Sequence, residues 1–276
     1  MSVRNILVAF NATESSDAAL GAALQMQEKY GAHLTGLYAH TGRIERLRHQ
    51  DWVPENMRHL LGNLASEDEG QVEAAFRKTV GARVPGERLH WISQEGRSDT
   101  TVADYGRLFD ITVVGRYDTV LANREIELHP DRIALRSGRP VLVVPRGWAP
   151  ERIHEHAVVA WDGSRASARA VADAMQILET KTRVTVLRVA SRNLTPALPG
   201  IDVEMALARH GVPVDSVTAD AGRQSVGEVI LQQCMNLSAG LLVMGAFERS
   251  VFREELLGGT TRHVLQNAKL PILLAH

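Results

Sequence analysis

The run Gly258-Gly259-Thr260-Thr261 places two glycines and two hydroxyl side chains where a helix is expected to begin. Glycines let the backbone approach an anion closely. The free N–H groups of a first helical turn, together with the hydroxyls, can then donate hydrogen bonds to phosphate. The same residues also suit a flexible turn that ends in a helix cap. They therefore indicate either a phosphate-binding loop or an ordinary helix start.

A carboxylate that could face a ligand is Asp162, which follows the apolar strand expected at 157–161. In an open parallel sheet, ligands bind beyond the carboxyl ends of the strands, and there Asp162 could accept hydrogen bonds from a ribose. Alternatively, the sequence Asp-Gly-Ser only makes the turn, and Ser164 caps the next helix. The other residues expected at these strand ends are Ala160, Trp161, Val189, Met244 and Gly245.

Several well-known site patterns are missing from the sequence. It contains no G-x-G-x-x-G after a strand, no G-x-x-x-x-G-K-[ST], no G-x-S-x-G with partners, no H-E-x-x-H and no C-x-x-C. We expect His154-Glu155-His156, which follows a proline-containing connector, to be a solvated linker rather than a metal site. The single cysteine, Cys234, shares a helical spacing with apolar residues and is expected to be a core thiol.

The elements that would position these residues occur twice along the chain. Three segments of the first half match three of the second in the same order: 4–20 with 155–171, 110–118 with 240–248, and 137–145 with 268–276. We therefore expect two domains, at 1–146 and 152–276, joined by the linker 146–152. The first carries an insertion at about 41–86 with a helical pattern near 53–80, for which a surface helical excursion is the default expectation.

Short, almost continuous apolar runs alternate with helical patterns in both copies. Such runs are typical of parallel strands that are covered on both faces, so each copy is expected to be a doubly wound α/β domain. In the second copy, strands are expected at 157–161, 183–190, 213–218, 241–245 and 272–275, and helices at 165–179, 201–210, 225–237 and 261–266.

The composition narrows the functional classes. Of the 276 residues, 45% are hydrophobic and 23% are charged, and the net charge is −1. We expect a globular, cytoplasmic protein without a signal peptide or transmembrane helix, because no apolar run is long enough. The near-zero net charge argues against binding nucleic acid or a membrane surface, and one cysteine fits a reducing compartment.

Together, the segments VVAWDGS, LLVMGA, LLGGTTRHVL and the terminal LPILLAH resemble the universal stress protein family, over nearly the whole chain except the insertion. The resemblance implies a five-stranded parallel sheet flanked by helices in each domain, the adenine nucleotide alpha hydrolase-like fold. Many members bind ATP through a G-x2-G-x9-G-[ST] loop after the fourth strand, and others do not. It also implies pairing through the last strand, either between the two repeats or in a homodimer.

Carried over by position, the resemblance gives the C-terminal repeat a partial nucleotide site. Gly245 and Gly258 stand at the first and third glycines, Asp162, Val189 and Met244 at nucleoside contacts, and Gly259 where the family has Ser or Thr, followed by the hydroxyls of Thr260 and Thr261. Glu248 replaces the second glycine. A carboxylate ~4 Å from a phosphate charge repels it by about 4 kcal/mol at an effective dielectric near 20.

Several ways of offsetting Glu248 remain open. Arg249, Arg253 or Arg262 could neutralise it, Mg²⁺ could bridge it to the phosphates, or it could face solvent while the site takes ADP or AMP in place of ATP. The first copy has drifted further, with Asn11 in place of the aspartate and no Gly-Gly-Thr run, and is expected to pair rather than bind nucleotide. The hypotheses are a regulatory adenine-nucleotide-binding protein, a non-nucleotide interaction protein, and a slow ATPase.

Overall fold

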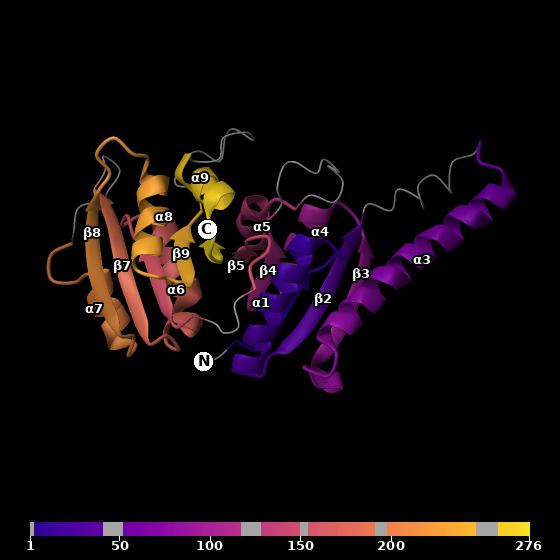
Figure 1. Cartoon of the computed structure of the whole chain (residues 1–276), viewed down its shortest axis with the longest axis horizontal. Coiled ribbons are helices and arrows are strands. Elements are labelled where there is room, and N and C mark those ends of the chain that lie inside the picture. Colours follow the sequence, from indigo (N-terminus) through magenta and orange to yellow (C-terminus); the bar gives the residue numbers. More distant parts are fainter. Residues whose placement is uncertain (1–2, 41–51, 117–127, 150–153, 191–197, 247–258) are drawn as a thin grey trace.

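The computed structural model describes residues 3–40, 52–116, 128–149, 154–190, 198–246 and 259–276. The strands form one ten-stranded sheet in the order β3-β2-β1-β4-β5-β10-β9-β6-β7-β8 (Figure 1). The strands are β1 (Asn5–Ala9), β2 (His33–His40), β3 (Leu89–Glu95), β4 (Ile111–Gly115), β5 (Val141–Val144), β6 (His156–Ala160), β7 (Arg183–Ala190), β8 (Val214–Asp220), β9 (Leu241–Gly245) and β10 (Ile272–Ala275). The α/β class and the mostly parallel sheet predicted from the apolar runs are confirmed.

The N-terminal half (β1 to β5) and the C-terminal half (β6 to β10) have the same strand order. From the edge inward, β3-β2-β1-β4-β5 corresponds to β8-β7-β6-β9-β10. Individual hydrogen bonds correspond as well: the backbone N–H of Phe10 donates to Leu37 O at 3.0 Å, and that of Trp161 donates to Leu187 O at 2.9 Å. Equivalent positions in the two halves can therefore be compared directly.

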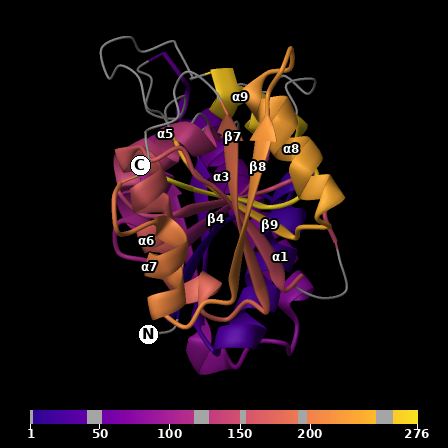
Figure 2. The same ribbon diagram turned by 90° about the vertical axis from the view of Figure 1, so that its left-hand side faces the viewer.

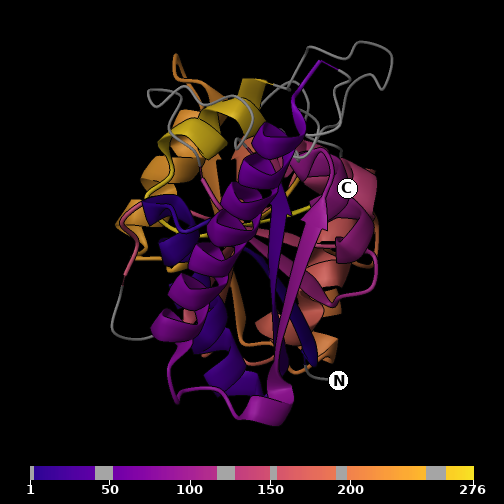
Figure 3. The same cartoon turned by 90° about the vertical axis from the view of Figure 1, so that its right-hand side faces the viewer.

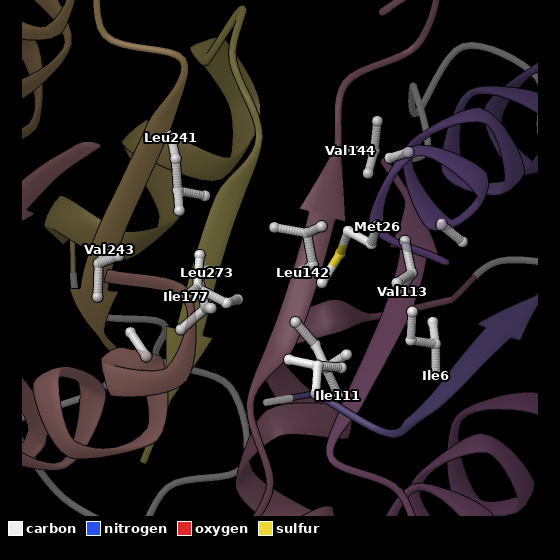
Figure 4. Packing of buried hydrophobic residues seen from close by; sticks show 14 of the residues in the cluster. Ile6, Met26, Ile111, Val113, Leu142, Val144, Ile177, Leu241, Val243 and Leu273 are labelled. Carbon is white, nitrogen blue, oxygen red and sulfur yellow. The ribbon is translucent and has the colours of Figure 1, made fainter. Parts of the chain in front are cut away.

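The halves meet where β5 and β10 pair antiparallel, the one antiparallel contact among the strand pairs of the described residues. Leu142 and Leu273 are opposite each other in this register and are 5% and 0% exposed. Figure 4 shows side chains from the two halves, among them Met26 and Ile177, on either side of this junction. Both strands are fully apolar, and their side chains are buried in the hydrophobic clusters on the two faces of the sheet.

Helices cover both faces of the sheet. One layer packs into a single hydrophobic cluster and contains α1 (Glu14–Tyr30), α3 (Glu55–Val80), α6 (Arg165–Leu178) and α7 (Val203–Arg209). The other packs into a second cluster and contains α4 (Ser98–Gly106), α5 (Pro130–Ser137), α8 (Val226–Asn236) and α9 (Gly259–Asn267). A short 3₁₀ helix, η1 (Gly86–Arg88), precedes β3. Figure 2, seen from the β8 edge, shows α6 and α7 on one side of β7 and β8 and α8 on the other.

Local sequence explains where several of these helices begin. At α8, the Ser225 hydroxyl accepts the backbone N–H of Glu228, and the Glu228 carboxylate accepts the backbone N–H of Ser225 at 2.7 Å, which is a complete capping box. At α6, the Ser164 hydroxyl accepts the N–H of Ser167 at 3.1 Å. These caps satisfy N–H groups that a helix leaves without an internal partner.

The helix α3 departs from the surface excursion expected for the segment 41–86. It begins and ends close to the predicted helical pattern, but its C-terminal part packs on the sheet (Figure 3). Phe76 is 0% exposed, and its ring centroid lies 5.6 Å from that of Phe10 and 4.9 Å from that of Trp91. The expectation was wrong for this end of the helix, because Phe76 packs in the core against one aromatic residue that directly follows β1 and another on β3.

Polar contacts also join the two halves at the end of α1. Lys29 Nζ lies 3.0 Å from Glu155 Oε1, and the Tyr30 hydroxyl lies 3.0 Å from Thr180 Oγ1. Nearby in the sequence, Lys181 is only 4% exposed and donates from Nζ to the carbonyl of His154 at 2.5 Å.

No helix in the described part of the chain has the length and apolar character needed to cross a membrane.

Candidate functional site

The strand order of the C-terminal half brings three predicted site residues together at the carboxyl ends of neighbouring strands. β6 lies between β9 and β7, and Ala160 is in register with Met244 on one side and with Leu187 on the other. Val189 lies two residues beyond Leu187 on the same strand. The junction of β6 and β9 is where the chain switches direction across the sheet, which is where ligands bind in open α/β sheets.

These three side chains also share one face of the sheet. Ala160, Val189 and Met244 all pack with the cluster on the α8 and α9 side. Val189 and Met244 are 7% and 5% exposed, so their side chains form the floor of the strand ends rather than an open surface. Trp161, which was also predicted for the site, instead packs against the cluster on the α6 and α7 side. The structure therefore groups Ala160, Val189 and Met244 and separates the Trp161 side chain from them.

Asp162 adopts the turn geometry that was one of its two interpretations. Its Oδ1 accepts the backbone N–H of Ser164 at 2.9 Å, and Gly163 between them has φ +78°, a left-handed conformation that glycine adopts without strain. Asp162 is half-buried. The turn sets the direction of the chain as α6 begins, and it fixes the Asp162 carboxylate at the carboxyl end of β6.

Gly245 has a packing reason for being glycine. A Cβ atom at this position would lie 2.5 Å from the carbonyl carbon of Ala166 and 2.7 Å from the backbone nitrogen of Ser167. The first turn of α6 therefore approaches the end of β9 as closely as backbone allows. In the N-terminal half, a Cβ at Gly115 would lie 2.1 Å from Ser15 O. This close contact is the same in both halves, so it requires these glycines whether or not a ligand binds.

Helix α9 begins at Gly259, two residues earlier than the start predicted at Thr261, so Gly259, Thr260 and Thr261 are its first three residues. Gly259 is exposed with open space where a Cβ would be, Thr260 is half-buried and Thr261 is 5% exposed. No acidic residue lies in the first turn of α9. Glu248 and Gly258 lie outside the described residues, as do Arg249 and Arg253.

The corresponding helix of the N-terminal half, α5, begins very differently. The carboxylate of Asp99 accepts the backbone N–H of His129, the N-cap residue, at 2.7 Å and lies 2.8 Å from His129 Nδ1. Pro130 occupies the first turn and has no N–H to donate. Asp131 adds a second carboxylate there; burial raises its pKa, while backbone N–H groups of Asp131 and Arg132 oppose the rise. Carboxylates thus already occupy this helix N-terminus, where an anion would otherwise bind.

A pocket lies at the carboxyl ends of the N-terminal strands. Its polar lining comes from Asn11, Ser16 and Ser98, and its apolar lining includes Phe10 and Leu128. The strand-end positions that line it correspond to those predicted for the site in the other half. Sequence reasoning missed both this pocket and the Asp99–His129 pair. The partners are 30 positions apart in the sequence, so no local pattern reveals the pair.

Two further expectations can be compared with the structure. Cys234 is buried at 1% exposure, and burial raises the pKa of its thiol to about 12, so the predicted core thiol is confirmed. The solvated linker expected at His154-Glu155-His156 was wrong for His156. This residue begins β6, with Nδ1 2.9 Å from Leu237 O and Nε2 2.9 Å from Thr185 Oγ1.

Within the described ranges, no group of three or more His, Cys, Asp or Glu could hold a metal.

Comparisons with known proteins agree with the fold. The model of the universal stress protein family matches residues 154–276. Among solved structures, a universal stress protein from Archaeoglobus fulgidus covers 98% of this chain and 95% of its own, with a TM-score of 0.68 and 13% identity. A functionally unknown protein from Pseudomonas aeruginosa covers 99% of this chain and 92% of its own, with a TM-score of 0.56 and 16% identity. At such identities the likeness shows the fold alone.

A smaller solved structure, a universal stress protein in complex with cAMP, covers 44% of this chain and 95% of its own at 21% identity. Its TM-score of 0.32 is too low to say anything about the fold or ligand of this chain. The comparison with curated proteins found no match.

Proposed function

Because residues 154–276 belong to the universal stress protein family, we propose that the C-terminal half binds an adenine nucleotide. ATP is the first candidate, with ADP or AMP as alternatives and with or without Mg²⁺. The protein would act in a cytoplasmic stress response through binding rather than through catalysis. The residues proposed to hold the nucleotide are Ala160, Trp161 through its backbone, Asp162, Val189, Met244, Gly245, Glu248, Gly258, Gly259, Thr260 and Thr261.

The observation that carries this proposal is the contrast between the first turns of α9 and α5. A helix N-terminus offers unpaired N–H groups and the positive end of the helix dipole, both of which favour an anion. In α5 the carboxylates of Asp99 and Asp131 already take this position. In α9 the first turn holds no acidic residue and starts with Gly259, Thr260 and Thr261. Phosphate binding is therefore favoured in the C-terminal half and disfavoured in the N-terminal half.

The nucleoside would lie toward the strand ends. Val189 and Met244 form a buried apolar floor on the α8 and α9 side of the sheet, against which the face of a base would pack. The Oδ1 atom of Asp162 already accepts a hydrogen bond from Ser164. A carboxylate oxygen has more than one lone pair, and Oδ2 adds two more, so Asp162 retains the capacity to accept a ribose hydroxyl.

A second candidate function is an interaction protein without a nucleotide. The low exposure of Val189 and Met244, 7% and 5%, favours this candidate, because strand ends that are already covered leave less apolar surface for a base. Native mass spectrometry of the purified protein separates the candidates. Co-purified ATP, ADP or AMP supports the first, and an unliganded mass that stays unchanged with millimolar ATP supports the second.

The site itself is tested by giving α9 the charge that α5 already has. Gly259→Asp introduces a carboxylate at the first residue of α9, into space that is open for a side chain. At ~4 Å from one phosphate charge it would repel the ligand by about 4 kcal/mol at an effective dielectric near 20, close to a thousandfold loss of affinity. Gly259→Asn, with nearly the same shape and no charge, is the matched control. The measurement is the Kd for a fluorescent ATP analogue by titration.

The two variants separate charge from shape. We expect Gly259→Asp to lose most of the affinity and Gly259→Asn to keep most of it. The aspartate variant should also be at least as stable to urea, because a negative charge suits a helix N-terminus. Equal affinities of both variants and the wild type would place the phosphate elsewhere and refute the site.

A further inference from the structure

The side chain of Arg116 reaches from the N-terminal half to α9 in the C-terminal half. Arg116 directly follows β4, and its Nη1 atom donates to the carbonyl of Ala268 at 2.6 Å. The same atom lies 3.5 Å from the carbonyl of Leu265. Ala268 directly follows the last residue of α9 and Leu265 lies in its last turn, 152 and 149 residues further along the chain than Arg116.

This contact supplies what the sequence of α9 itself lacks. The last carbonyl groups of a helix have no partner within the helix, and a positive charge near them complements the negative end of the helix dipole. No basic residue lies in the last turn of α9. The guanidinium of Arg116 therefore provides, from the other half, the cationic cap that a basic residue in the helix's own last turn could otherwise supply.

Arg116 is well placed to hold α9 because its own backbone is fixed. Its N–H donates to the carbonyl of Val144 at 2.8 Å, and its carbonyl accepts the hydroxyl of Ser15 at 2.8 Å. The first bond ties it to β5 and the second to α1, both in the N-terminal half. The position of the guanidinium is thus set by the sheet rather than by a free loop.

We infer that Arg116 is a positioning residue for the proposed nucleotide site, acting through α9. This inference rests on the proposed function. α9 has nine residues, so Ala268 and the glycine-threonine run lie about 13 Å apart along one short helix. Because the helix is so short, displacing its C-terminal end would tilt its N-terminal end as well. The N-terminal half, whose own anion position is filled by Asp99, would serve the nucleotide site by supporting this helix.

The structure offers a matched contact in the opposite direction. Arg169 of α6 donates from Nη2 to the carbonyl of Gly138, the C-cap residue of α5, at 3.4 Å. In this contact too, an arginine of one half binds the C-terminal end of a helix in the other half. It serves α5, which is not the proposed nucleotide helix, so Arg169→Met controls for a general loosening of the two halves.

The test compares Arg116→Met, Arg116→Lys and Arg169→Met in the full-length protein. Methionine keeps much of the arginine stem and removes the charge and donors, while lysine restores a cation and a donor. The first readout is hydrogen–deuterium exchange of the α9 amides without nucleotide. The second is the Kd for a fluorescent ATP analogue. We expect Arg116→Met to speed exchange in α9 and to raise this Kd about 3- to 30-fold.

Arg116→Lys should recover part of both effects, and Arg169→Met should change neither. Unchanged exchange in α9 of Arg116→Met would overturn the inference whatever the Kd. Faster exchange with an unchanged Kd would also overturn it, because α9 would then be capped without positioning the site. If the wild type binds no ATP analogue, the proposed function is refuted, and so is the role of Arg116 in nucleotide binding. The exchange data would then still report whether Arg116 holds α9. If Arg116→Met does not fold, the lysine variant tests both effects.

Discussion

The buried side chain of Lys181 predicts how the free energy of unfolding depends on pH. Its side chain is 4% exposed, and burial lowers its pKa from 10.5 to about 8. The nearby Glu155 carboxylate opposes this shift and Lys29 adds to it. A difference between about 8 and 10.5 corresponds to roughly 3 kcal/mol of interaction free energy that disfavours the charged form in the folded state.

The sign follows from the protons that each state binds. Between pH 8 and 10.5 the unfolded chain keeps the Lys181 proton and the folded protein releases it, so the free energy of unfolding rises with pH. Below pH 8 both states are protonated and the folded protein carries the full cost of the buried charge. Lys181→Met removes this titration. Relative to the variant, wild-type stability should therefore rise by roughly 3 kcal/mol from pH 7.5 to 10.5.

The measurement is urea unfolding followed by tryptophan fluorescence, at several pH values across this window, for wild type and Lys181→Met. Other groups that titrate in the same range cancel in the difference between the two proteins. Lys269→Met, which removes an exposed lysine, controls for the loss of one positive charge. A stability difference between wild type and Lys181→Met that does not change with pH would refute the account of Lys181 as a buried, neutralisable amine.

Two further predictions concern the turns and the assembly. Ala12 has φ +56° and corresponds to Gly163 of the other half; Ala12→Gly should therefore stabilise the protein by about 0.5–1 kcal/mol, and Gly163→Ala should destabilise it by about 1 kcal/mol, in urea unfolding. Similar effects of the two substitutions would contradict this. If the halves of one chain pair through β5 and β10, light scattering should give the mass of a single chain, 30.3 kDa, and a species of twice that mass would contradict it.

Much of the C-terminal half could be predicted from local sequence. Its strands and its four helices lie within two residues of the predicted bounds, because apolar runs and capping residues act over a few positions. The capping box at Ser225 and Glu228 is an example. Ala160, Val189 and Met244 were also predicted to lie at the carboxyl ends of the strands, and the three side chains do lie on one face of the sheet there.

What could not be predicted depends on partners far apart in sequence. Phe76 is buried because it packs against Phe10 and Trp91, and no helical pattern near Phe76 reveals those partners. Lys181 follows a helix in a polar stretch typical of an exposed turn, yet the packing of the two halves buries it. A strand as uniformly apolar as β10 shows that it is buried without showing that its neighbours are β9 and β5.

The two halves differ in which end of their last helix a charged side chain contacts. Asp99 lies at the N-terminal end of α5, and Arg116 lies at the C-terminal end of α9. Each charge complements the helix dipole at the end it touches. A carboxylate that complements the N-terminal end also fills the position that a phosphate would take, whereas a guanidinium at the C-terminal end leaves the N-terminal end open. The two last helices therefore differ in which end has the charged partner, and within the described residues the first turn of α9 holds no carboxylate, which is why the nucleotide is proposed there.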